Sequence, residues 1–242
     1  MLYRFDLHLH SCLSPCGDLE CAPSAVVEKA QSVGLNGLML ADHNTSKNAP
    51  ACAEHCRRRG IACLFGMEVT SSEEVHALAV FDTIDQAAAM TEFVYAALPK
   101  RVNQPEIFGD QPVVNADDEI EELEWRLLSA PTRLPLKTIG EKIHELGGLF
   151  IPTHVDRPTF SVFSQLGGIA GDEGFDAVEL SRFADPAEWK DKLCGLAIIR
   201  SSDAHYLENI GSIWTELELS GFNVAALKKA FASPGAPDTV SP

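Results

Sequence analysis

The feature that most constrains the fold of this chain is a regular alternation of short apolar segments with amphipathic ones. Segments rich in apolar and β-branched residues are predicted strands at 3–9, 37–41, 61–69, 75–81, 148–153, 175–180, 196–202 and 212–219. Apolar residues recur at helical spacing in 23–34, 47–60, 85–98, 135–148 and 223–233. This alternation favours an α/β fold with a parallel sheet, and a length of 242 residues favours a barrel over an open sheet.

Residues 99–134 interrupt the alternation. This stretch contains an acidic run between Asp117 and Glu124, and it is longer than an ordinary connection between two elements. We interpret it as an acidic helix that faces water, within a surface excursion of a single domain that spans residues 1–242. The alternative is a mobile lid over the functional site.

The charge balance bears on partners and location. The chain has 19 Lys and Arg residues against 35 Asp and Glu residues, a formal net charge of −16. Because nucleic acids bind mainly through phosphates neutralised by Lys and Arg, we expect no stable binding to duplex nucleic acid. The N-terminal residues do not resemble a signal peptide, and no apolar run approaches the ~18 residues of a spanning helix. We therefore predict a cytoplasmic protein that does not bind membranes.

Histidines and carboxylates gather around the predicted strand ends. We place six of the eight histidines at or just past the C-terminal end of a strand: His8, His10, His43, His76, His154 and His205. Four carboxylates accompany them: Asp6, Asp42, Glu68 and Asp203. Because the C-terminal ends of parallel strands converge on one face, these side chains are predicted to share a site. Such a set of ligands indicates a metal site for Zn, Mn or Fe.

Other candidate ligands are weaker. His55 and His144 lie inside amphipathic helical segments, and we assign them no role. Cys12, Cys16 and Cys21 match none of the spacings that hold iron–sulfur clusters. Cys52 and Cys56 lie one helical turn apart and are interpreted as small apolar residues on a buried face. The seven cysteines are expected to stay reduced.

Five ordered motifs resemble those of the PHP family, named for polymerase and histidinol phosphatase. They are DLHLHS (6–11), ADHN (41–44), GMEV (66–69) followed by EVH (74–76), TH (153–154) and SSDAH (201–205). The resemblance covers most of the chain. It implies a distorted, TIM-like (β/α)7 barrel that holds two to three divalent ions at its C-terminal rim and acts as a phosphoesterase.

The resemblance also implies a role for each matching residue. The first ion would take His8, His10, Glu68 and Asp203. The second would share Glu68 and take His76 and His154. The third would take Asp18, His43 and His205. Asp6 and Asp42 would orient imidazoles, and Asp42 is also a candidate catalytic residue. Glu20 and Cys16 are alternatives to Asp18, because the segment after HLHS departs from the family pattern.

The expected chemistry is hydrolysis of a phosphoester by a metal-bound hydroxide. Three basic residues near strand ends are candidates to bind the substrate phosphate: Arg157, Arg182 and Lys47. Arg157 is also a candidate catalytic residue. The predicted function is a metal-dependent phosphoesterase that acts on a small phosphorylated metabolite, a nucleotide or an oligonucleotide end. The alternatives are a non-catalytic metal-binding PHP module and a hydrolase of another ester or amide.

Overall fold

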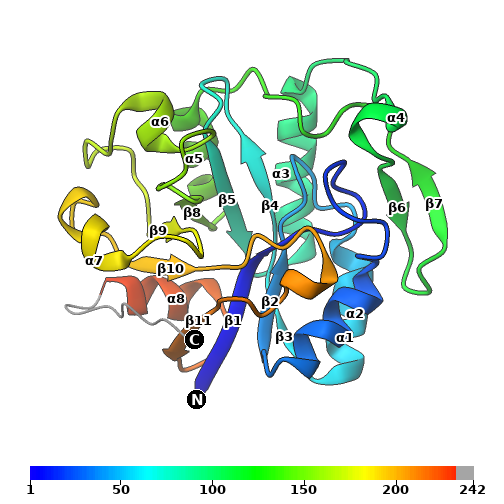
Figure 1. Ribbon diagram of the computed structural model, residues 1–242, viewed down its shortest axis with the longest axis horizontal. Helices are drawn as coiled ribbons and strands as arrows, with labels where there is room; N and C mark the ends of the chain where they lie inside the picture. Colours follow the sequence, from blue (N-terminus) through cyan, green and yellow to red (C-terminus); the bar gives the residue numbers. More distant parts are fainter. Residues whose placement is uncertain (233–242) are drawn as a thin grey trace.

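Strands and helices alternate along the chain in a computed structural model, which describes residues 1–232 (Figure 1). The predicted strands are β1 (Leu2–Leu9), β2 (Gly37–Leu40), β3 (Ala62–Cys63), β4 (Phe65–Thr70), β5 (His76–Phe81), β8 (Leu149–Pro152), β9 (Val178–Leu180), β10 (Ile198–Arg200) and β11 (Thr215–Glu218). The predicted helices are α1 (Pro23–Ser32), α2 (Ala49–Arg59), α3 (Ile84–Ala97), α5 (Leu136–Glu145) and α8 (Val224–Phe231). The last residue of the helix predicted over 223–233 lies outside the described residues.

The strands belong to several separate hydrogen-bonded sheets. Their orders are β11-β1-β2-β3, β4-β5-β8 and β10-β9, and two further strands, β6 (Pro112–Val114) and β7 (Ile120–Leu123), form a hairpin. Single bridges between Leu9 and Ala204 and between His43 and Glu68 link neighbouring sheets. The described residues therefore have a mixed α/β fold without a closed barrel, and the predicted TIM-like barrel is not confirmed.

A further departure from a regular (β/α) barrel is the direction of β5. It pairs antiparallel with both β4 and β8. The connection from β4 to β5 covers only residues 71–75, whereas a parallel connection needs a dozen or more residues. Ser71 holds this turn tightly, because its hydroxyl accepts hydrogen bonds from the backbone N–H groups of Glu73 and Val75. A hairpin replaces one βα unit here.

Successive side chains of a strand point to opposite faces, so they belong to two different apolar clusters. One cluster lies on the inner side of the strands, and the other lies between the strands and the surrounding helices. In β5, Leu78 and Val80 join the inner cluster, whereas Ala77, Ala79 and Phe81 join the cluster that packs against α3 and α5. The outer side of β2 packs against α1 and α2 in the same way. Residues in or just after β2, β4, β8 and β10, together with the first residue of β5, line one opening in the surface. These strands are labelled in Figure 1.

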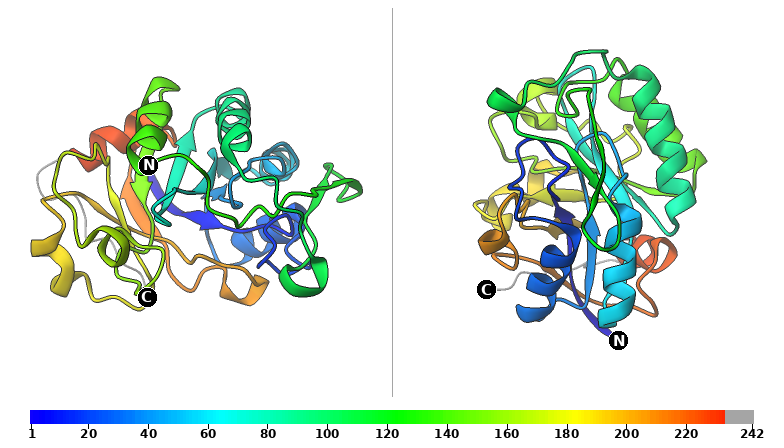
Figure 2. Two further views of the ribbon diagram at one scale, coloured as in Figure 1. Left: turned by 90° about the horizontal axis from the view of Figure 1, so that it is seen from above. Right: turned by 90° about the vertical axis from the view of Figure 1, so that its right-hand side faces the viewer.

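The excursion at 99–134 has its own structure. It contains the short helix α4 (Pro105–Phe108) and the hairpin β6–β7, which lies at one edge of the molecule (Figure 2). The acidic run forms the turn and strand β7, so the predicted acidic helix is wrong. Apolar side chains of the excursion instead pack beneath it, among them Val113, Leu127 and Leu128.

The C-terminal half adds short elements: α6 (Val162–Leu166), α7 (Pro186–Trp189) and the 3-10 turns η1 (Lys190–Lys192) and η2 (Leu207–Asn209). Among residues 1–232, no helix has both the length and the apolar character needed to cross a bilayer.

Candidate metal centre

The first two predicted ligands are histidines at the end of the first strand. His8 lies in β1 and His10 directly follows it. Because they are two residues apart on an extended chain, their side chains leave on the same face, and their ring centroids are 5.1 Å apart. Both rings are buried. They form one wall of the site.

Four more predicted ligands follow strands, as expected. His43 comes after β2, His154 after β8, and Asp203 and His205 after β10. His154 and Asp203 have left-handed backbone, with φ of 32° and 49°. Such strain costs on the order of 1–3 kcal/mol per residue and is typical of functional sites.

The placement of two ligands differs from the prediction. Glu68 is inside β4 rather than at its end, and His76 is the first residue of β5 rather than the last of a strand. His76 still reaches the common opening because β5 runs antiparallel to β4, so the start of β5 lies beside the end of β4. The β4–β5 turn thus contributes one ligand from each of its strands.

Glu68 occupies the centre of the site. Its two carboxylate oxygens lie 3.0–3.6 Å from a ring nitrogen of each of five histidines: His8, His10, His43, His76 and His154. Asp203 adds a second carboxylate, whose Oδ1 lies 3.3 Å from Nε2 of both His8 and His10. A single carboxylate with this many imidazole neighbours is well placed to bridge two ions.

The distances between the histidine nitrogens and the carboxylate oxygens fit ligands of a shared metal ion better than hydrogen-bonded pairs. Four buried ring nitrogens in the site have no hydrogen-bond partner: Nε2 of His8, Nε2 of His10, Nδ1 of His43 and Nδ1 of His154. Two ligands that each lie about 2.0–2.2 Å from one ion are about 3.0–3.5 Å apart. The nitrogen–oxygen distances around Glu68 fall close to this range, so the residues present fit divalent ions.

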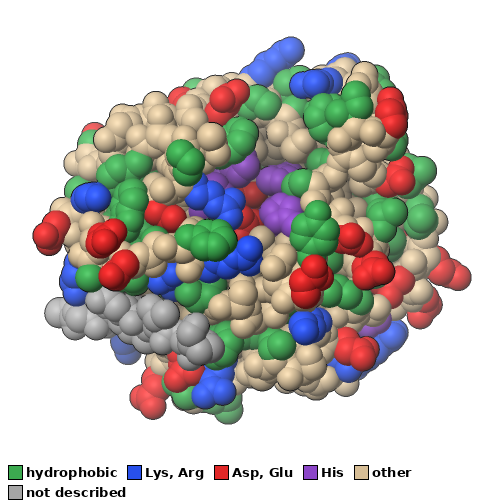
Figure 3. Space-filling model, viewed as in Figure 1, with side chains coloured by type: hydrophobic (Ala, Val, Ile, Leu, Met, Phe, Trp, Pro, Cys, Tyr) green, Lys and Arg blue, Asp and Glu red, His purple; other side chains and the backbone are tan. Residues whose placement is uncertain are grey.

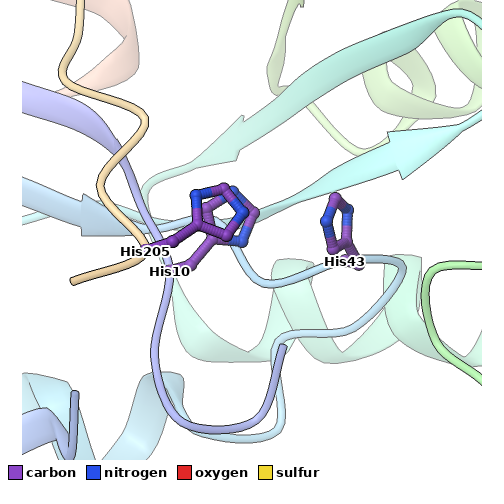
Figure 4. A group of neighbouring side chains, drawn as sticks. All are labelled: His10, His43 and His205. Carbon is purple, nitrogen blue, oxygen red and sulfur yellow. The ribbon is translucent and has the colours of Figure 1, made fainter. Parts of the chain in front are cut away.

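The site contains three groups of residues in which the potential ligand atoms lie within 4.8 Å of one another. They are His8, His10 and Asp203; His43, Glu68 and His76; and His10, His43 and His205. In the third group the rings of His10 and His205 stack at 4.1 Å, and His43 stands across from them (Figure 4). These groups correspond in part to the three ion positions that the sequence predicts.

The third predicted ion position is the least complete in the structure, because one of its predicted ligands lies apart from the others. Asp18 is in none of the three groups, and its Oδ1 accepts a hydrogen bond from the backbone of Glu20. The side chain of Glu20 is exposed. Of the three alternatives, Cys16 lies closest to the histidines, with its Sγ 3.2 Å from Nε2 of His43.

Glu179 is a further residue of the candidate site, and it is absent from the set predicted from the sequence. It is buried in β9, and its carboxylate lies 2.9 Å from Nδ1 of His8 and accepts a hydrogen bond from the backbone N–H of His154. The sequence signal was a carboxylate within an otherwise apolar strand. By accepting a hydrogen bond from Nδ1–H, Glu179 orients the ring of His8 so that Nε2 faces Glu68 and Asp203.

We predict that Glu179→Ala weakens metal binding about 10- to 100-fold, because His8 loses the partner that orients its ring. Glu179→Gln keeps an acceptor oxygen and should recover part of the affinity. Calorimetric metal titration measures both, with exposed Glu188→Ala as the control. Unchanged affinity in Glu179→Ala would show that His8 is held by other contacts.

Asp42 and Asp6 organise the site without touching a ring. Asp42 accepts hydrogen bonds from the hydroxyls of Ser11 and Ser14, and Ser14 Oγ in turn lies 2.9 Å from Nδ1 of His10. Asp6 accepts hydrogen bonds from the backbone of His8 and from Ser202. Both carboxylates position other residues, and Asp42 reaches His10 only through Ser14.

Burial and neighbouring charges set the protonation of the histidines. Burial lowers the pKa of His10 to about 4 and that of His43 well below its usual value, so both rings are neutral. Burial opposes the charge of His8, but Glu179 and Glu68 hold its pKa well above the usual value. Burial also disfavours the charge of Glu68, but His76 and His8 hold its pKa well below the usual range. The site therefore favours cations.

A cavity of about 100 Å³ opens onto this cluster. Figure 3 shows histidines at the bottom of a hollow in this face of the molecule. Arg157, Thr159 and Phe160 contribute to its lining, and the Arg157 guanidinium lies 2.6 Å from the Asp203 carboxylate. Arg157 thus lies at the cavity that the ligands line.

The other two basic candidates have partners elsewhere. Lys47 forms ion pairs with Glu122 and Glu124, which connect it to the excursion. Arg182 donates hydrogen bonds to Asn209 and Ser212. Neither residue lines the cavity, so the structure brings only Arg157 of the three to the ligands.

The chain matches a known protein family and is similar to several solved structures. Residues 6–144 match the model described as PHP domain, and residues 188–233 match one described as PHP-associated. No curated protein matches the chain significantly.

Three solved structures share the fold. A lesion-specific endonuclease Q from Pyrococcus furiosus aligns with a TM-score of 0.66 at 20% identity over 96% of this chain. A complex of endonuclease Q with a 27-mer duplex aligns with a TM-score of 0.68 at 19% identity, also over 96%. This chain spans 56% of the length of each of these two chains. A protein from Bifidobacterium adolescentis, described as a putative metal-dependent phosphoesterase, aligns with a TM-score of 0.59 at 21% identity, over 83% of this chain and 87% of its own.

These structures correct the prediction about partners. The sequence predicts a small-molecule phosphoester as the substrate and no stable binding to duplex nucleic acid. In one of these structures, however, a duplex DNA substrate has an abasic lesion at the active site. The prediction was wrong because net charge governs weak, non-specific binding over the whole surface. A cavity lined by metal ligands can meet one phosphate locally, whatever the total charge.

Proposed function

This chain belongs to the PHP family, and from that premise we propose that it is a metal-dependent phosphoesterase. The observation that carries the proposal is the position of Glu68 among five histidines, with four buried ring nitrogens that lack a hydrogen-bond partner. Buried polar groups without partners are rare unless they serve a ligand. The donor set of imidazoles and carboxylates suits Zn, Mn or Fe.

We assign two to three ions to the predicted ligands. His8, His10, Glu68 and Asp203 would hold the first. Glu68, His76 and His154 would hold the second. His43 and His205 would contribute to a third, and Cys16 Sγ lies 3.2 Å from Nε2 of His43. When bound, divalent ions activate water and screen the negative charge of a phosphoryl group.

The protein's own residues prepare the site. Neutral His10 and His43 offer lone pairs without first losing a proton at neutral pH. Glu179 and the Ser14–Asp42 pair hold the rings of His8 and His10 in position. Arg157 supplies a planar cation at the cavity, where it can donate to phosphate oxygens.

A substrate panel with added Mn, Zn or Fe tests the activity. It should include phosphomonoesters, phosphodiesters, a duplex with an abasic site, and a carboxylic ester and an amide. We expect turnover of at least one phosphoester by the wild-type chain, and turnover lower by about a thousandfold or more in Glu68→Ala. Turnover of only the carboxylic ester or the amide would replace this proposal with the other hydrolase class. Full metal loading without any turnover would indicate a binding module.

Arg157→Ala should lower kcat/KM by about 10- to 1000-fold, or about 1.4–4 kcal/mol of transition-state stabilisation, and leave metal content intact. Arg157→Lys should recover activity only in part, because Lys keeps the charge but loses the planar fork. Steady-state kinetics and elemental analysis measure the two effects. Because Arg157 also contacts Asp203, loss of metal in Arg157→Ala would instead assign it to support of that ligand.

A further inference from the structure

A second group of potential ligands lies apart from the histidines. Cys52 and Cys56 are one turn apart on α2, with their Sγ atoms 4.0 Å from each other. Cys63 is the last residue of β3, and its Sγ lies within 4.8 Å of both. Cys52 and Cys56 are buried, and Cys63 is partly exposed. Three thiols from two elements therefore meet between α2 and the edge of the sheet.

This thiol group is remote from the candidate metal centre. Cys63 pairs with Leu38 in the register between β3 and β2. His43 follows Leu38 by five residues, which corresponds to roughly 17 Å of extended chain. The group therefore lies toward the N-terminal ends of the strands, near the end of α2 (Figure 1). It is not part of the histidine site.

The spacing of the sulfurs fits a shared ion. A thiolate lies about 2.3 Å from a bound Zn ion, so three sulfurs arranged in a plane around such an ion are about 4.0 Å apart. The Cys52–Cys56 distance has this value. Within residues 1–232, no fourth His, Cys, Asp or Glu joins the group, which favours an ion that accepts three sulfur ligands.

Thiolates are the form of cysteine that binds metals, so binding of an ion here would displace the thiol protons. The partly exposed Cys63 provides a route for an ion to reach the two buried sulfurs.

We propose that Cys52, Cys56 and Cys63 bind a thiophilic cation as three thiolates, and that Cu(I) is the ion this site fits best. Soft thiolate ligands select Cu(I) over harder ions. The site is independent of the phosphoesterase proposal, because it uses none of the same residues. It would link the end of α2 to the edge strand β3.

Titration of the reduced full-length chain with Cu(I), in competition with a Cu(I) chelator, tests this site. We expect one equivalent to resist the chelator and X-ray absorption of that ion to show only sulfur neighbours. Cys63→Ser should weaken binding at least tenfold, whereas Cys194→Ser, at an exposed cysteine, should leave it unchanged. Circular dichroism checks the fold, and Cys63→Ala replaces Cys63→Ser if the latter does not fold.

Two results would overturn the proposal. One is equal Cu(I) affinity in the wild-type chain and the folded Cys63 variant. The other is an absorption spectrum with nitrogen or oxygen neighbours, which would place the ion at the histidines. Either result would leave the three thiols as small apolar residues that pack between α2 and β3.

Discussion

Glu68→Ala is expected to lose at least two ions and to lower kcat/KM about a thousandfold or more, which is about 4 kcal/mol. The reason is its central position, since its two oxygens lie near the nitrogens of five histidines. A carboxylate that serves two ions contributes to both, and each ion stabilises the transition state by several kcal/mol. Metal titration and steady-state kinetics on an identified phosphoester measure the two losses.

His10→Ala is the informative comparison for this prediction. In the proposed arrangement His10 serves mainly the first ion, so its variant should retain more metal than Glu68→Ala. Glu145→Ala, at an exposed residue that pairs with Lys142 on the same helix, controls for loss of a carboxylate. Equal metal loss in the Glu68 and His10 variants would remove the bridging role of Glu68.

Chelation should abolish activity and lower the melting temperature by about 8–16 °C. Ligand present at a thousandfold excess over Kd stabilises a protein by about 4 kcal/mol. One kcal/mol corresponds to about 2–4 °C for a chain of this size. Elemental analysis of protein prepared without chelator should find two to three equivalents, and added Mn, Zn or Fe should restore both activity and melting temperature.

The same chelator treatment of Glu68→Ala supplies the control. If the stabilisation comes from ions at this site, the variant should show a much smaller shift in melting temperature. Less than one equivalent of metal in the wild-type chain after reconstitution would contradict the assignment of several ions. An equal shift in both proteins would indicate that the chelated metal lies elsewhere, for example at the three cysteines.

Much of the fold could be predicted from local patterns. The main strands and helices were correct because apolar residues at spacings of two and of three to four are visible in a single sequence. Sheet hydrogen bonding was not visible, since it depends on which strands pair and in which direction. The five residues between β4 and β5 were too few for a parallel connection, and that observation could have indicated the hairpin.

The ligands that belong to recognisable sequence motifs could be predicted. His8, Glu68, His154 and Asp203 were identified from residue type and order, and the structure brings them together. Glu179 was missed because its role depends on its carboxylate reaching His8 of β1 and the backbone of His154 after β8 in three dimensions, which no spacing in the sequence reveals.

The β4–β5 hairpin also bears on how this scaffold could be altered. Glu68 and His76 stand on its two strands, and the turn between them has no spare length, so an insertion at 71–75 would shift two ligands at once. The longer loops after β8 and β10 contribute residues to the cavity lining and are better positions for engineering substrate scope. A library that leaves residues 68–76 intact and varies 158–161 and 206–212 would explore specificity while keeping the ligand geometry.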